Sequence, residues 1–245
     1  MKIRSTLTVL IIISIITGCE INDPVSSYDQ QYIHGSDSLV TEIRDLPQFH
    51  SISHNTVGEV NITYGEEQKV EVTVNVNYID YVKTSVSDGQ LNISLARNKS
   101  YSDLKLKLDI IMTDLYALGT SSAGNIHGQN RFITDEVSLA TASAGNISLE
   151  LEAEKLFSTI GSAGNINLCG KVDKHYALLL SAGNLNAYNL ETRTTSISIN
   201  SAGNGFVYVT DYLEARLNSA GNLYYKGNPT IESSMNSIGR IYGMN

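Results

Sequence analysis

Apolar and polar residues alternate along most of the chain from about residue 41 onward. Successive side chains of a β-strand point to opposite faces, so a period of two predicts strands with one buried face. Turn-forming residues separate these runs, as in the Ser-Asp-Gly-Gln sequence at 87–90. The clearest predicted strands before residue 111 are 60–64, 70–76, 91–95 and 104–110.

The second half of the chain repeats one tetrapeptide, Ser-Ala-Gly-Asn. Six copies begin 18 to 21 residues apart, and a degenerate copy, Ser-Ile-Gly-Arg, follows at 237–240. Repeats of this length indicate a solenoid in which each copy forms one coil. The segment 150–157 (ELEAEKLF) has a helix-forming composition, but the other copies have a strand at this place, so we interpret it as strand or corner. The six copies are 122–125, 143–146, 162–165, 181–184, 201–204 and 219–222.

Further columns align when the copies are stacked on their asparagine. The positions one after, five before and nine before the asparagine are largely apolar, and we expect them to face inward. A single coil cannot bury its own apolar face, so stability must come from stacking each strand on the same strand of the next coil. The sequence therefore predicts an all-β fold, a parallel β-helix (β-solenoid) with coils of about 20 residues.

The tetrapeptide itself has a structural interpretation as the corner of each coil. Glycine adopts a positive φ without a Cβ clash, serine and alanine are small enough to stack, and asparagine amides in register can form a hydrogen-bonded ladder. The alternative is a stripe of serine and asparagine that binds a ligand. The predicted corner residues are Gly124, Asn125, Gly145, Asn146, Gly164, Asn165, Gly183, Asn184, Gly203, Asn204, Gly221 and Asn222.

The N-terminus has the order of a bacterial lipoprotein signal. A basic start precedes ten apolar residues, 7–16, which are too few to span a bilayer, and small residues then precede Cys19. We predict a signal peptide over 1–18, a lipid on Cys19, a flexible tether over 19–40 and one folded domain over 41–245. The alternative is an ordinary secretory signal with a chance cysteine.

Charge and cysteine content limit the partners. The chain has 17 basic and 25 acidic residues, a formal net charge of −8, and removal of 1–18 would make it more negative because Lys2 and Arg4 are lost. This argues against nucleic acid or anionic lipid headgroups as partners. With Cys19 lipidated, Cys169 is the one remaining thiol, which excludes a disulfide framework.

Candidate catalytic groups are scattered. The densest acidic group, Asp135-Glu136 with Glu150, Glu152 and Glu154, is typical of a solvated face. His50 and His54 are four residues apart in a strand region and do not match the helical spacing of a zinc pair. Cys169 lies in a column of outward parity with no histidine near it in sequence. We therefore expect no catalytic residue, no metal and no cofactor.

Two outward columns change from polar to aromatic residues toward the C-terminus. They lie two and four positions after the asparagine, and if the parity holds they form one exposed aromatic patch. Such a patch suits sugar rings or a protein partner. The alternatives are that a C-terminal segment or a second subunit covers it, or that tyrosine serves only as a good strand residue. The candidate binding residues are Tyr188, Phe206, Tyr208, Tyr224 and Tyr242.

The words SAGNI, SAGNL and SAGNG resemble the glycine corners of the auto-transporter adhesin head GIN domain family. The opening also fits, with Leu46-Pro47-Gln48-Phe49-His50-Ser51-Ile52, a valine-rich strand pair and Asp88-Gly89-Gln90-Leu91-Asn92-Ile93. The resemblance covers about 42–245 and departs from the family in having alanine where serine is usual. It implies a right-handed β-helix of pectin-lyase-like shape, in outer-membrane or secreted proteins of gut-type Bacteroidota, with no catalytic residue set.

Together these features predict a non-catalytic, lipid-anchored envelope protein that acts in cell adhesion as a binding or scaffold module. The expected partners are the membrane, through the lipid, and a glycan or a host or cell-surface protein. The expected location is the outer membrane, at its cell-surface or periplasmic face. Two alternatives are a glycan-active β-helix enzyme, such as a polysaccharide lyase or hydrolase, and a periplasmic structural lipoprotein. The sequence leaves the oligomeric state open.

Overall fold

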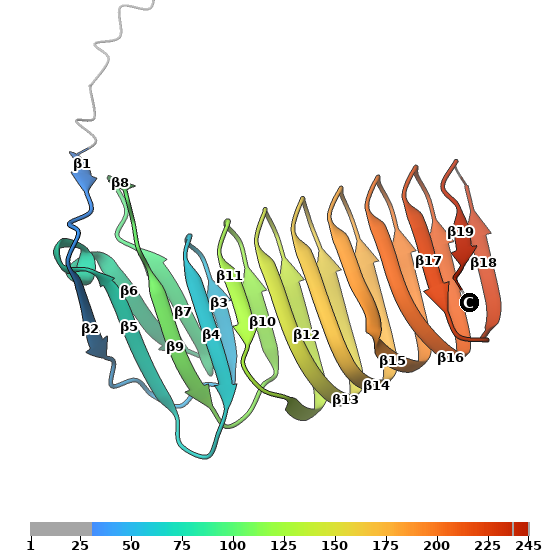
Figure 1. The fold of residues 1–245 in the computed structure, drawn as a ribbon, viewed down its shortest axis with the longest axis horizontal. Coiled ribbons are helices and arrows are strands. Elements are labelled where there is room, and N and C mark those ends of the chain that lie inside the picture. The colour runs from blue at the N-terminus through green and yellow to red at the C-terminus, as the bar shows by residue number, and fades with distance from the viewer. Residues whose placement is uncertain (1–30, 237, 245) are drawn as a thin grey trace, which may run out of the picture. The chain divides into compact units, whose positions relative to one another are not determined.

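The fold is a parallel β-solenoid, as the repeat predicts. The computed structural model describes residues 31–236 and 238–244, so the predicted signal peptide, Cys19 and the first part of the tether lie outside the described residues. The described chain is nearly all β, with about seven solenoid turns spaced by about 19 residues (Figure 1). The all-β solenoid prediction is therefore confirmed.

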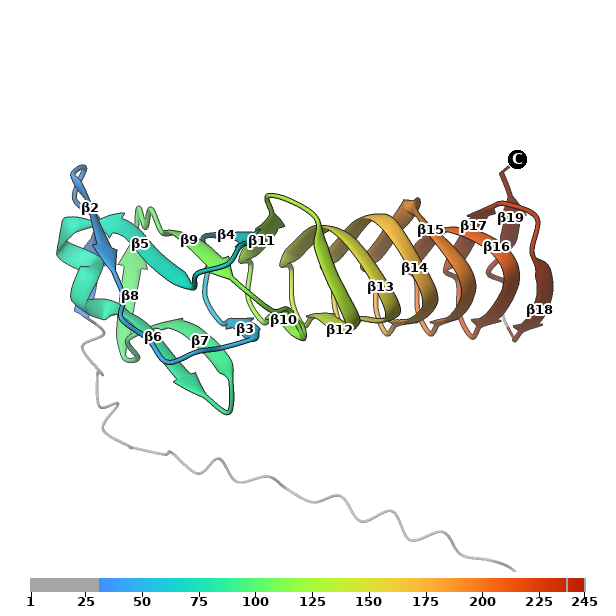
Figure 2. The ribbon, with the colours of Figure 1, turned by 90° about the horizontal axis from the view of Figure 1, so that it is seen from below.

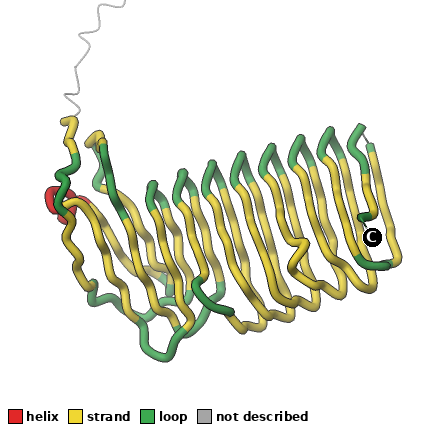
Figure 3. Tube along the Cα trace, in the orientation of Figure 1, coloured by secondary structure: helices red, strands yellow, loops and turns green. Residues whose placement is uncertain are grey.

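Each central coil is one long strand that bends once and ends at the Ser-Ala-Gly-Asn corner. Figure 3 shows these corners as loops aligned along one edge of the solenoid. The segment 150–157 lies within such a strand, which confirms its interpretation as strand. We call the half-coil after each asparagine the first wall and the half-coil before the next corner the second wall. The central strands are β12 (Phe132–Thr141), β13 (Asn146–Ile160), β14 (Asn165–Leu179), β15 (Asn184–Ile199) and β16 (Asn204–Leu217).

The repeated columns stack in register and form the core between the two walls. In β13, for example, Ile147 of the first wall and Leu156 and Ile160 of the second wall are fully buried, and each is paired with the same column of β14. The inward prediction fails at three residues. Tyr116 is 53% exposed outside β10, and Ile231 and Met235 are 39% and 52% exposed because they lie on the last coil.

The spatial order of the first coils differs from their order in the chain. The coil made by β3 and β4 pairs in parallel with β10 and β11 on one side and with β7 and β9 on the other, although β7 and β9 come later in sequence than β4 (Figures 1 and 2). The chain therefore adds two strands outside its first coil before it begins the regular stack. These strands are β3 (Ser51–His54), β4 (Glu59–Tyr64), β7 (Gln90–Leu95), β9 (Lys107–Met112), β10 (Ala117–Thr120) and β11 (Asn125–Gly128).

Antiparallel strands and a short helix close this N-terminal end. β5 pairs antiparallel with β2 and β9, and β6 pairs antiparallel with β7 through the Asp88-Gly89 turn. Tyr78 of the 3-10 helix is fully buried, and its hydroxyl donates to the Ser102 carbonyl at 2.8 Å. The elements are β2 (Leu39–Ile43), β5 (Lys69–Asn75), η1 (Val76–Tyr81) and β6 (Val82–Ser87), with β1 (Gln31–His34) and β8 (Lys99–Ser102) as a separate parallel pair.

Three expectations for this region need correction. The tether was expected to reach residue 40, but β1 and the start of β2 are hydrogen-bonded strands, so residues 31–40 belong to the fold. Val76 was expected on the buried face of a strand, but it begins η1 and is 48% exposed. The strand expected from 104 begins only at Lys107.

The corner glycines are required for a different reason from the one expected. Positive φ occurs at Gly58, Gly89, Gly170 and Gly227, and at no glycine of the six tetrapeptides. A Cβ on Gly183 would instead lie 2.3 Å from the carbonyl oxygen of Gly164, its counterpart one coil earlier. Because the Cβ of each glycine would point at the backbone of the preceding coil, the stacking distance itself excludes a side chain.

The asparagine ladder is confirmed. Each corner asparagine donates from Nδ2 to Oδ1 of the asparagine one coil earlier, from Asn146 on Asn125 at 2.8 Å to Asn222 on Asn204 at 3.3 Å. A second ladder, which the repeat alignment missed, joins Asn218 to Asn200 and Asn236 to Asn218. The last coil consists of β17 (Asn222–Lys226), β18 (Thr230–Met235) and β19 (Ile241–Gly243).

Candidate binding face

The outer surface of the first wall has a polar half and an aromatic half. The polar half holds His127, Ser148, Asn167 and Asn186, each two positions after its corner asparagine. In the next three coils the same column holds Phe206, Tyr224 and Tyr242, which are paired in register across β16, β17 and β19. The predicted column therefore exists, and its change of chemistry occurs between β15 and β16.

The aromatic rings of this column stack on one another. The ring centroids of Phe206 and Tyr224 are 4.9 Å apart with an interplanar angle of 10°, and those of Tyr224 and Tyr242 are 5.0 Å apart at 13°. Tyr188 meets Phe206 edge-on, with centroids 5.3 Å apart at 76°. We call these four residues the aromatic ladder. Its ring spacing follows the strand spacing of the solenoid, about 4.8 Å, because one ring comes from each coil.

Tyr188 joins the ladder through a bulge and not through the expected column. Ala187 pairs with Val207, but the next partner of β16 is Glu191, which pairs with Tyr208. The three residues between them have no partner in β16, so the expectation that Tyr188 and Tyr208 share a column is wrong. Thr192 stabilises the end of the bulge, since its hydroxyl donates to the Tyr208 carbonyl at 2.7 Å.

Lys226 connects Tyr208 to the ladder. Its Nζ lies 4.7 Å from the ring centroid of Tyr208 and 5.9 Å from that of Tyr188, within the range of cation–π attraction. Burial raises the pKa of the Tyr188 hydroxyl, with a smaller contribution from Tyr224. That hydroxyl is buried without a hydrogen-bond partner in the structure. All five candidate residues thus lie together, but they are half-buried and not fully exposed.

Stacking determines which atoms a ligand could reach. The faces of Phe206 and Tyr224 are covered by their neighbours in the ladder, so a sugar ring could not stack on them. The accessible parts are the ring edges, which carry partial positive charge, and the tyrosine hydroxyls, which donate and accept hydrogen bonds. This surface therefore fits an oxygen-rich ligand that approaches the edges of the rings.

A hollow of about 420 Å³ lies on the polar half of the same wall. Ser148, Asn167 and Asn186 form a short ladder along it, with Asn186 Nδ2 donating to Asn167 Oδ1 at 2.8 Å. Cys169 lines the hollow as a half-buried free thiol, and burial raises its pKa, which disfavours the reactive thiolate. Glu150 also lines it and is held by Arg131, whose Nε donates to Glu150 Oε1 at 2.7 Å.

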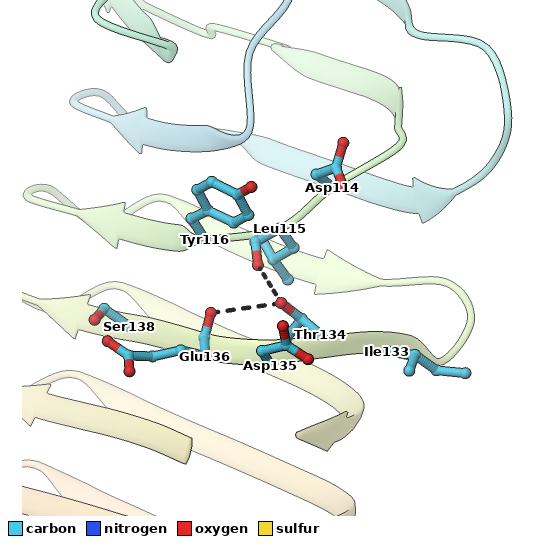
Figure 4. A pocket seen from close by; sticks show the side chains of 8 residues that line it. All are labelled: Asp114, Leu115, Tyr116, Ile133, Thr134, Asp135, Glu136 and Ser138. Carbon is cyan, nitrogen blue, oxygen red and sulfur yellow. Dashed lines mark hydrogen bonds between the residues drawn. The ribbon is translucent and has the colours of Figure 1, made fainter. Parts of the chain in front are cut away.

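A larger hollow of about 550 Å³ lies at the junction of β10 and β12 (Figure 4). Figure 4 shows Tyr116 on one side and the carboxylates of Asp135 and Glu136 on the other, while Thr134 donates to the Leu115 carbonyl at 3.2 Å. Ile133 at its edge is 64% exposed. Asp135 and Glu136 are both exposed, and Glu136 pairs with Lys155 at 3.4 Å. Its acids therefore have the environment of an ordinary solvated surface.

The histidines do not come together as a metal site. His54 is fully buried, with Nε2 3.2 Å from the Gly58 carbonyl oxygen, and burial lowers its pKa. His50 packs against Tyr116 instead, with ring centroids 4.3 Å apart and ring planes tilted by 32°. Within residues 31–236 and 238–244, no group of three or more His, Cys, Asp or Glu side chains could hold a metal ion.

One of the columns predicted to face inward places a polar side chain in the core. His175 is 1% exposed, its Nε2 lies 2.9 Å from Ser158 Oγ, and burial lowers its pKa to about 4. The column nine positions before the asparagine gave a signal, because it places His175 and Thr195 among leucines. The His175 imidazole is therefore neutral at pH 7 and packs in the interior of the solenoid.

Comparison with known proteins supports the fold. Residues 48–229 match the family model described as "Putative auto-transporter adhesin, head GIN domain". A crystal structure of a putative adhesin from Bacteroides fragilis superposes with a TM-score of 0.83 at 24% identity, covering 86% of this chain and 100% of the other. A putative lipid binding protein from Parabacteroides distasonis gives a TM-score of 0.73 at 22% identity, covering 88% of this chain and 100% of the other. The search of curated proteins found no match. In the described part of the chain, no helix is long and apolar enough to cross a membrane.

Proposed function

Because the chain belongs to the head GIN domain family of auto-transporter adhesins, we propose that it is a non-catalytic, adhesin-like binding module of the bacterial envelope. The observation that carries the proposal is the aromatic ladder with Tyr208 and Lys226 on the first wall. Five aromatic side chains from three coils and one bulge gather there, whereas the preceding coils present polar side chains at the same positions. The fold does not require aromatic residues at these positions, because the preceding coils have polar residues there. Their presence in the last coils therefore suggests a binding function.

The chemistry of this face favours a glycan over an apolar partner. Ring edges, phenol hydroxyls and the Lys226 ammonium group all interact with oxygen atoms. The neighbouring amides of Asn167 and Asn186 add donors and acceptors on the same wall. A surface protein rich in exposed carbonyl and carboxylate groups is the second ligand class that fits.

We further propose that the chain is anchored in the outer membrane by a lipid on Cys19. The support is the order of basic start, apolar run and small residues before the cysteine. A family of adhesins suggests a surface or envelope location. The anchor would leave the solenoid outside the bilayer, where the first wall could meet a ligand.

A glycan-active enzyme and a purely structural lipoprotein are the competing functions. The enzyme would need clustered carboxylates with altered pKa values. The carboxylates described above are instead dispersed, and those of Glu150 and Glu136 pair with basic side chains. Incubation with uronate-containing polysaccharides decides this point, since released fragments would contradict the non-catalytic proposal.

The binding proposal is tested with an array of glycans and matrix proteins. The compact unit of residues 31–245 contains the buried core of the described residues, so we expect it to fold without the N-terminal segment. We expect it to bind a subset of glycans. No retention on glycans, matrix proteins or intact bacterial cells would refute the proposal. Protease treatment of intact cells tests the location separately, because protection of the chain would contradict display at the surface.

A further inference from the structure

The last coil of the solenoid exposes residues that the repeat otherwise buries. All six residues of β18 are exposed, including Ile231 at 39% and Met235 at 52%. Their partners one coil earlier, Leu213 and Leu217, are fully buried. The last coil therefore covers the core, while its own apolar side chains are left uncovered at the end of the solenoid where β18 lies (Figure 1).

The N-terminal end of the solenoid, in contrast, is covered by further elements of the chain. There β5 pairs antiparallel with β9, β2 pairs antiparallel with β5, and Tyr78 of η1 is fully buried. At the C-terminal end, β18 pairs with β16 and β19 pairs with β17, and among the described residues no strand pairs with their outer edges. An unpaired edge of this kind is a template for another strand.

The backbone of β18 offers free hydrogen-bonding groups at regular positions. The Asn236 amide donates to the Leu217 carbonyl at 2.9 Å. Because backbone groups alternate in direction along a strand, those of Thr230, Glu232 and Ser234 also point toward β16. The N–H and C=O groups of Ile231, Ser233 and Met235 therefore point away from the solenoid. These same three residues have their side chains on the core side, in register with Leu213, Ala215 and Leu217.

We propose that this end pairs with the same end of a second copy of the chain, β18 against β18 in antiparallel register centred on Ser233. In this register Ser233 faces Ser233 of the second copy, and Ile231 faces Met235. Each facing pair then exchanges two backbone hydrogen bonds, which satisfies every outward group of the strand. The apolar side chains of both copies meet on the core side, so the two interiors become continuous.

The outer face of β18 supports a second copy as the occupant. In the same register Glu232 faces Ser234, so no like charges are opposed. Glu232 is also held by the Tyr212 hydroxyl, which donates to it at 2.5 Å. A surface that must meet itself across a two-fold axis needs this self-complementarity.

The pairing has a consequence for adhesion that rests on the proposed function. β1 lies at the opposite end of the solenoid from β18 (Figure 1). Two copies joined through β18 would therefore carry their N-terminal strands at the two far ends. If each chain is anchored at its N-terminus, the pair would link two separate surfaces and not two neighbours on one surface.

The experiment measures association of residues 31–245 in solution and needs neither the lipid nor the aromatic ladder. One strand pair buries little area, so we expect a weak dimer, visible by sedimentation between about 1 µM and about 1 mM. Ile231→Lys should weaken the association constant at least tenfold without changing the melting temperature of the monomer. A monomer at every concentration would overturn the proposal, while leaving glycan binding by the first wall unaffected.

Disulfide trapping tests the register. In a Cys169→Ala background, Ser233→Cys should form a covalent dimer on oxidation, because facing Cα atoms in a hydrogen-bonded antiparallel pair are about 5.5 Å apart, within disulfide range. Ser234→Cys is the matched control, since its partner is Glu232 and not itself. Equal trapping of both variants would contradict the register centred on Ser233.

Discussion

The Nδ2 atom of Asn165 donates to Oδ1 of Asn146 at 2.9 Å, although the two residues are 19 positions apart in the chain. The same side chain accepts a hydrogen bond from Asn184 at 3.1 Å. Each rung of the ladder therefore depends on the one before and the one after it. The corner is held by amide stacking between coils, because a half-buried amide that lost both partners would have little water to replace them.

Removing a middle rung should destabilise the fold. Asn165→Ala leaves Asn184 without its acceptor and Asn146 without its donor, so we expect a loss of about 1–3 kcal/mol in the free energy of unfolding. Urea denaturation measures it. Asn186→Ala is the control, because Asn186 lies on the exposed surface, where water can replace the hydrogen bond that its amide donates to Asn167. If Asn165→Ala changed the free energy of unfolding by less than about 0.5 kcal/mol, the ladder would not contribute to stability.

The glycine of the corner makes a sharper prediction. Gly183→Ala would place a Cβ 2.3 Å from both the Gly164 carbonyl oxygen and Ile160 Cγ2, so we expect a loss of at least about 2 kcal/mol through forced separation of two coils. Gly119→Ala is the matched control, since its Cβ would come no closer than 3.9 Å to the Ile52 carbonyl oxygen. Thermal unfolding followed by circular dichroism should separate the two variants, and similar melting temperatures would contradict the steric explanation.

Buried His175 should make the stability of the fold sensitive to acid. Its pKa is about 4 in the folded chain and about 6.5 when unfolded, so the unfolded chain binds more protons between these values. Stability contributed by the neutral imidazole is complete above pH 6.5, decreases as the pH falls, and is lost below pH 4, a total of about 3 kcal/mol. Denaturation at several pH values measures this slope. In His175→Leu the slope should be smaller, although buried His54 still adds to it in the same direction.

The sequence predicted the regular part of this fold better than its ends. The columns around Asn146 and Ile147 recur in most coils, so alignment alone identifies wall, corner and core. The β3–β4 coil could not be placed that way, because its neighbours β7 and β9 come later in the chain and pair with it through long-range contacts. The need for glycine was recognised, but its cause was misjudged, since the sequence does not show how closely one corner approaches the next.

The sequence predicted which residues form the candidate site, but it did not predict the bulge or the stacking of the rings. Parity placed Phe206, Tyr224 and Tyr242 on one outer column, and the structure has them there. It could not predict the bulge at Tyr188, because an insertion within a strand shifts the parity after it without changing the hydrophobic pattern before it. Nor could it show that the rings stack face to face, which leaves their edges accessible in place of their faces.

The chain supplies its own control for the aromatic surface. Phe157 and Tyr176 form a second stacked pair, with ring centroids 5.1 Å apart, on the outer side of the second wall. This pair matches Phe206 and Tyr224 in spacing and angle but has no bulge and no lysine over its rings among the contacts described. A ligand that recognises any exposed aromatic pair would bind both walls equally.

The most direct test of the central claim is therefore the affinity of Tyr208→Ala/Tyr224→Ala for the ligands retained by the wild-type unit, compared with Tyr176→Ala. The account predicts at least a tenfold loss for the double variant, because it removes the Lys226 contact and the middle of the ladder. It predicts no loss for Tyr176→Ala. Circular dichroism confirms that both variants remain folded. Wild-type affinity in the folded double variant, or an equal loss in Tyr176→Ala, would contradict the claim that the first wall is the binding face.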